Sequence, residues 1–164
     1  MRKCLFLFVI SGLFVYGLSM PIITADAYLE FTIPQRVEIA LSTAVVDLGT
    51  PHGTGQLYFE QIDAVQVDFR CNIPSDWEVR ISAADFRDGN RRIPISRLQW
   101  RTGLGSYQNM PPSGNYAVIA RGRDYARTQR GLKQSKSVSY RLELKGDEWG
   151  GTYSAPITYT LFVP

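Results

Sequence analysis

The sequence predicts an all-β fold: one antiparallel sandwich of two sheets, with eight or nine strands. Three observations carry this prediction. Apolar residues recur at every second position in four segments. Aromatic residues make up 12% of the 164 residues, and 14 Gly and 9 Pro divide the chain into short pieces. Aromatic side chains favour strands, and Gly and Pro favour the turns between them.

Each strictly alternating segment is expected to form a strand with one face in the core. The expected core-facing residues are Val65, Val67, Phe69 and Cys71; Trp77, Val79, Ile81 and Ala83; Val138, Tyr140, Leu142 and Leu144; and Ile157, Tyr159, Leu161 and Val163. Weaker strand candidates are 28–33, 36–41, 45–48, 93–100 and 116–120, and turns are expected at 72–76, 88–90 and 145–147.

The chain shows no apolar stripe of helical period. Residues 121–136 are read as a long loop with room for one helical turn, because charged residues dominate them. Short strands without intervening helices are typical of an immunoglobulin-like sandwich.

The first segment has the features of a secretory signal peptide. Arg2 and Lys3 precede an apolar run over 4–18, and Ala25-Asp26-Ala27 offers a small–x–small cleavage site. An uncleaved anchor is the alternative, but the run is shorter than the roughly 20 residues that a membrane span needs. We therefore predict a signal peptide over 1–27, an exported protein and a single sandwich domain over 28–164.

The mature chain offers little material for catalysis. Cys71 is its only cysteine, so no intramolecular disulfide is expected, and its position in an alternating strand predicts a buried thiol. His52 lies in an expected turn and has no recognisable nucleophile motif near it. Asp85–Asn90 lacks the full spacing of a calcium loop. We therefore expect no enzymatic activity, no cofactor and no metal site.

Basic residues gather in the predicted loop. Those singled out as contacts for an anionic polymer are Arg121, Arg123, Arg127, Arg130 and Lys133. Export argues against nucleic acid as the bound polymer and favours cell-wall or envelope polysaccharide. The alternative is a loop that is charged only for solubility.

The three tryptophans differ in their expected surroundings. Trp77 and Trp100 share the parity of core residues, whereas Trp149 stands beside two glycines in a turn. Trp149 is therefore the one tryptophan expected to offer an exposed platform for a sugar.

Two stretches resemble the signatures of WxL-type bacterial surface domains. Residues 76–86 are similar to the first signature, and residues 151–161 are similar to the second, C-terminal one. Val79 stands where that family has Leu, and Tyr159 stands in place of its Trp. Similar C-terminal strands occur in pilin-like sandwiches. The resemblance marks Trp77, Val79, Tyr159 and Leu161 as family-motif positions and implies attachment to wall polymer.

These observations lead to three functional hypotheses. The first is an exported, non-enzymatic structural or adhesive module of the cell surface, bound to wall polymer or to other surface proteins. The second is a subunit of a surface fibre that self-assembles by exchange of its terminal strands. The third is a carbohydrate-binding module that uses Trp149.

Overall fold

The computed structural model describes residues 27–55 and 57–164. The chain divides into two units, Met1–Ile33 and Pro34–Pro164. In the first unit only residues 27–33 are described, and they form neither strand nor helix. The predicted signal peptide therefore lies, except for Ala27, outside the described residues. The described helices include none that is long and apolar enough to cross a membrane.

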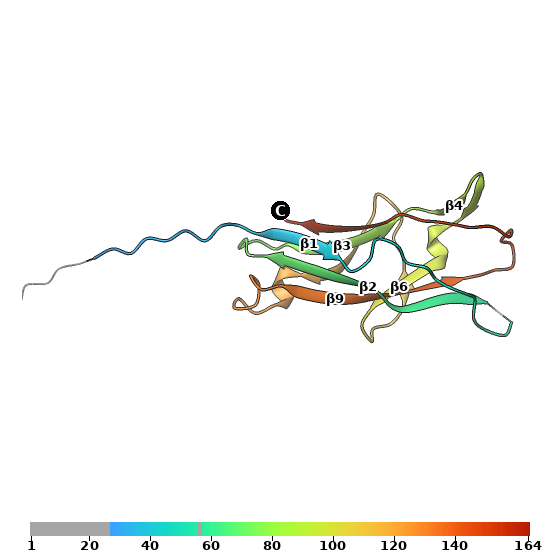
Figure 1. Ribbon diagram of the computed structural model, residues 1–164, viewed down its shortest axis with the longest axis horizontal. Coiled ribbons are helices and arrows are strands. Elements are labelled where there is room, and N and C mark those ends of the chain that lie inside the picture. Colours follow the sequence, from blue (N-terminus) through green and yellow to red (C-terminus); the bar gives the residue numbers. More distant parts are fainter. Residues whose placement is uncertain (1–26, 56) are drawn as a thin grey trace, which may run out of the picture. The chain divides into compact units, whose positions relative to one another are not determined.

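The second unit confirms the all-β sandwich (Figure 1). Its described residues form ten strands and two single-turn 3-10 helices. In chain order these are β1 (Val37–Leu41), β2 (Tyr58–Cys71), β3 (Glu78–Ala83), β4 (Phe86–Asp88), β5 (Arg91–Ile93), η1 (Ile95–Arg97), β6 (Leu98–Thr102), β7 (Gln108–Asn109), β8 (Ala117–Arg121), η2 (Gly122–Asp124), β9 (Gln134–Glu143) and β10 (Ile157–Phe162).

All strand pairs are antiparallel and belong to three sheets. The first sheet has the order β1-β2-β9-β6-β7, the second has the order β10-β3-β8, and β4 and β5 form a separate hairpin. Figure 1 shows β10, in red, running beside β3 at the edge of the second sheet. The first and last long strands of the domain, β1 and β10, therefore both lie at sheet edges.

One core joins the two larger sheets. The alternating residues of β2, β3 and β9 point into it, as predicted, and Trp77 and Trp100 are each 1% exposed. Cys71 is a buried, free thiol, also as predicted. The core is held by apolar burial, which contributes about 25 cal/mol per Å² of apolar surface removed from water.

Several predicted strands differ from the observed ones. Residues 28–33 and 45–48 form no ladder, and 93–100 is interrupted after β5 because Pro94 leads into η1. Short pairs such as β4–β5 and β6–β7 raise the count to ten, above the eight or nine expected. The predicted loop at 121–136 does contain one helical turn, η2, but β9 already begins at Gln134.

Candidate functional site

The edge of the sandwich between β1 and β10 is incompletely covered. Val37, Ile39 and Leu41 of β1 pair with Cys71, Phe69 and Val67 of β2, all of which are buried in the core. Directly opposite residues in a ladder point to the same face of the sheet. The three β1 side chains therefore face the core side, yet they remain 45%, 37% and 42% exposed.

The same holds for β10 on the other sheet. Ile157, Tyr159 and Leu161 pair with Ala83, Ile81 and Val79, which are fully buried. The β10 side chains are nevertheless only partly buried. We call these six core-facing residues of β1 and β10 the open edge.

The two strands of the open edge lie close together without pairing. Their Cα atoms come within 8 Å at the nearest points. Across the described residues no hydrogen-bonded ladder joins β1 to β10. Each strand thus has one unpaired backbone edge, which is the usual template for an added strand.

A hydrogen bond between two tyrosines ties the open edge to the opposite sheet. The hydroxyl groups of Tyr159 on β10 and Tyr140 on β9 share it. Burial raises the pKa of Tyr159 to about 12 and raises the pKa of Tyr140 as well. Tyr159, one of the family-motif positions, therefore links the two sheets.

This pair predicts a loss of stability in alkali. The unfolded tyrosines titrate near pH 10 and the folded ones titrate higher, so their contribution is complete below about pH 10 and falls as the pH rises further. We expect the urea midpoint to fall between pH 9 and pH 12, and to fall less steeply in Tyr159→Phe. Tyr116→Phe, a change at an exposed tyrosine, is the control and should follow the parent. If the urea midpoint fell equally steeply with pH in Tyr159→Phe and in the parent, Tyr159 would not contribute to the loss of stability in alkali.

Residues 28–33, which belong to the first unit, carry an alternating pattern of their own. Leu29, Phe31 and Ile33 alternate with Glu30 and Thr32, and all three apolar side chains are at least 71% exposed. Three exposed apolar residues at period two are what one face of a buried strand requires. The sequence prediction of a strand at 28–33 was wrong for the single chain, because no strand among residues 27–55 and 57–164 pairs with this segment.

Asn72 anchors the backbone of the residues that follow this segment. The Asn72 side chain accepts a hydrogen bond from the Arg36 N–H at 2.7 Å and donates one to the Pro34 carbonyl at 2.9 Å. The Asn72 N–H also donates to the Arg36 carbonyl. Asn72 thus fixes the backbone of residues 34–36 beside the end of β2, so these residues do not form a hairpin turn.

The predicted polymer-binding loop is partly engaged with its own domain. Arg121 lies 3.4 Å from Glu78, and Lys133 lies 2.8 Å from Asp68. Hydrogen bonds from Gln66 and Lys133 lower the pKa of Asp68 to about 2. Arg130 donates to the Tyr125 carbonyl. Of the five basic residues, Arg123, Arg127 and Arg130 form no ion pair in the part of the chain that the structure describes.

The other predicted residues fall into two groups. Trp77 and Val79 are buried, whereas Leu161 belongs to the open edge and Trp149 is highly exposed in the loop between β9 and β10. His52 lies in an exposed turn that bridges to Tyr58. Within 27–55 and 57–164, no three His, Cys, Asp or Glu side chains gather closely enough to hold a metal ion.

Sequence reasoning missed the open edge itself. The available signal was the alternating pattern of 28–33 followed directly by that of 36–41.

Comparisons with known proteins identify the fold. No family model and no curated protein matches the chain. A solved structure of a chaperone–tip adhesin complex, described as vital for synergistic activation of CFA/I fimbriae biogenesis, contains a similar chain. The likeness has a TM-score of 0.50 and 18% sequence identity, and it covers 78% of this chain. This protein spans 41% of that longer chain, and the likeness shows a shared fold.

Proposed function

We propose that this protein is an exported, non-enzymatic subunit of a surface fibre. Residues 28–33 of one copy complete the open edge of the next copy. The observation that carries the proposal is the open edge, where six core-facing apolar residues remain partly accessible to water on two strands that each have one unpaired backbone edge. An added strand would remove both the exposed apolar surface and the unpaired backbone groups.

The segment 28–33 has the chemistry that the open edge requires. Its three apolar residues, Leu29, Phe31 and Ile33, match in number and spacing the three core-facing residues on β1. Glu30 and Thr32 would then point to water. Burying each of the three apolar side chains contributes about 1.5–3 kcal/mol.

The geometry of residues 34–36 favours donation to another molecule. A strand returned to its own β1 would need a tight reversal here, and the three hydrogen bonds at Asn72 hold these residues beside the end of β2 instead. Donation from copy to copy is a head-to-tail contact, which generates an open chain of subunits.

The similar solved chain gives limited support. It comes from a fimbrial chaperone–tip adhesin complex, so the fold is compatible with a place in a surface fibre. The attachment to wall polymer implied by the WxL-type resemblance, and polymer binding by the loop at 121–133, stay predictions.

Assembly tests the proposal. We expect the chain 28–164, refolded from denaturant at high concentration, to form a ladder of oligomers in size-exclusion chromatography with light scattering. A protein that lacks 28–33 should remain monomeric, because it has no strand to donate. A peptide of residues 27–35 added in excess should shorten the oligomers.

The matched acceptor variant is Ile39→Glu, which places a charge in the open edge and leaves 28–33 unchanged. Phe162→Glu is its control, because Phe162 lies on the outer face of β10. We expect Ile39→Glu to abolish oligomers and Phe162→Glu to retain them. Monomers of the refolded parent at every concentration would refute the proposal.

A further inference from the structure

A second feature lies at the cavity between the β4–β5 hairpin and the loop that joins β9 to β10. The cavity has a volume of about 280 Å³. Its walls include Asn90, Arg91, Arg92, Asp147, Trp149 and Tyr153. This volume is at the small end of the range for ligand pockets, so it suits one ring of a small ligand.

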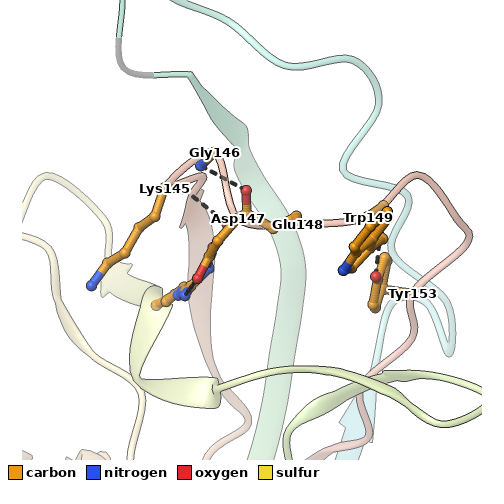
Figure 2. A network of polar contacts seen from close by, with 7 residues as sticks. Lys145, Gly146, Asp147, Glu148, Trp149 and Tyr153 are labelled. Carbon is orange, nitrogen blue, oxygen red and sulfur yellow. Dashed lines mark hydrogen bonds and ion pairs between the residues drawn. The ribbon is translucent and has the colours of Figure 1, made fainter.

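Trp149 is the aromatic wall of this cavity. Its side chain is 74% exposed, whereas Trp77 and Trp100 are 1% exposed. Figure 2 shows the rings of Trp149 and Tyr153 beside one another, and the Tyr153 hydroxyl donates to the Trp149 carbonyl at 3.1 Å. A flat apolar ring beside polar groups offers a surface on which the apolar face of a sugar can stack.

The charges around the cavity are balanced. Arg97 forms a bidentate pair with Asp147, with both N–O distances 2.7 Å, and also contacts Glu148. Arg92 lies 2.6 Å from Asp85, and Arg91 lies 3.7 Å from Asp88. Each lining arginine therefore faces a carboxylate, so an anionic ligand would find no unmatched cation there.

Asp147 and Glu148 are stabilised in their ionised form by these contacts. Hydrogen bonding to Arg97 lowers the pKa of Asp147. Burial tends to raise the pKa of Glu148, but backbone N–H donors from Lys145 and Gly146 and the charge of Arg97 lower it overall. Figure 2 shows these two backbone donors directed at the Glu148 side chain.

The exposed groups include both donors and acceptors. The side chains of Arg91 and Arg92 are about half exposed, and that of Asp147 is 63% exposed. Guanidinium N–H groups donate and carboxylate oxygens accept, so together they satisfy hydroxyl groups, which do both.

The walls are fixed before any ligand arrives. Arg91 donates to the Gly150 carbonyl at 2.6 Å, and the backbones of Arg87 and Ser154 exchange two hydrogen bonds. Gly151 packs so closely on the hairpin that a Cβ there would lie 2.1 Å from an Asp88 carboxylate oxygen. A site ordered in advance costs less entropy on binding.

We infer that this cavity binds one pyranose ring of a neutral saccharide, with the sugar face on Trp149 and its hydroxyl groups on Arg91, Arg92 and Asp147. None of the lining residues belongs to the open edge, because they come from the β4–β5 hairpin, η1 and the loop between β9 and β10. It would give each fibre subunit a glycan contact of its own.

Isothermal titration calorimetry with the mature chain tests the inference. The probes are the methyl glycosides of glucose, galactose and N-acetylglucosamine, with glucuronate as the acidic comparison. We expect at least one neutral glycoside to bind with a Kd of about 1–10 mM, as suits one ring on an open platform. Binding should also change the fluorescence of Trp149, the one exposed tryptophan.

Trp149→Ala should abolish the heat of binding without lowering the melting temperature, because the side chain is exposed. Tyr116→Ala, a change at an exposed aromatic residue outside the cavity, should bind like the parent. Three results would overturn the inference: no heat from any neutral glycoside at tens of millimolar, unchanged binding in Trp149→Ala, or binding of glucuronate alone.

Discussion

A second copy of residues 28–33, joined behind Pro164 by a short Asn-Gly turn, is expected to raise the melting temperature by about 10 °C or more. The added strand would follow β10 directly and lie along the open edge. Burial of its three apolar residues and of the edge residues that they meet exceeds the entropy lost on ordering six residues by a few kcal/mol. The protein should also become monomeric, because its own edge is then filled.

The control carries serine in place of the appended copies of Leu29, Phe31 and Ile33. It has the same length and turn but no apolar face, so we expect no rise in melting temperature from it and continued oligomerisation. Thermal unfolding followed by circular dichroism compares the two proteins. If both proteins melted at the same temperature, the open edge would not be an acceptor for this segment.

The core was predictable because strand alternation directly reports side-chain direction. Trp77, Trp100 and Tyr140 were all expected inside from parity alone, and all are buried. This holds where the ladder is regular, since period two then continues without interruption.

The pattern failed where the ladder is irregular. β2 begins at Tyr58, but the sequence indicated only its second half, because a register shift lies between Gln61 and Val65. Asp63 sits in this bulge with a φ of 50°, and its N–H donates to the buried Ser139 hydroxyl. A bulge moves the side chains that follow it to the other face of the sheet. The apolar positions before and after the bulge therefore do not share one parity, and the sequence does not show them as one strand.

The open edge was beyond sequence reasoning for a different reason. Alternation shows that Ile39 and Leu161 face the core side, but it does not show whether a neighbouring strand covers them. Coverage depends on which strands occupy adjacent positions in the sheets, and this is set by long-range pairing. The sequence indicates that terminal strands could be exchanged between copies. Only the structure shows that none of its described strands lies between β1 and β10.

Trp77 is expected to be the side chain whose removal lowers the free energy of unfolding most. It is 1% exposed, its ring stacks on Tyr125 with centroids 5.8 Å apart, and Phe69 meets it edge-on at 5.7 Å. Trp77→Ala should therefore lower the free energy of unfolding by about 3–5 kcal/mol in urea denaturation. Trp149→Ala removes the same side chain from an exposed loop and should change stability by less than about 0.5 kcal/mol. Similar losses in the two variants would show that Trp77 does not anchor the core.

Gly122 tests the same packing from the other side. Its N–H donates to the Trp77 carbonyl, and a Cβ at this position would lie 2.9 Å from the indole nitrogen. Gly122→Ala should therefore destabilise the protein by about 1–3 kcal/mol, because the ring must shift within a packed core. In a Trp77→Phe background the smaller ring leaves room for the methyl group, so the cost of Gly122→Ala should fall by half or more. A double-mutant cycle measures this coupling. Additive losses would mean that the alanine acts on the backbone of η2 and not through contact with the indole ring.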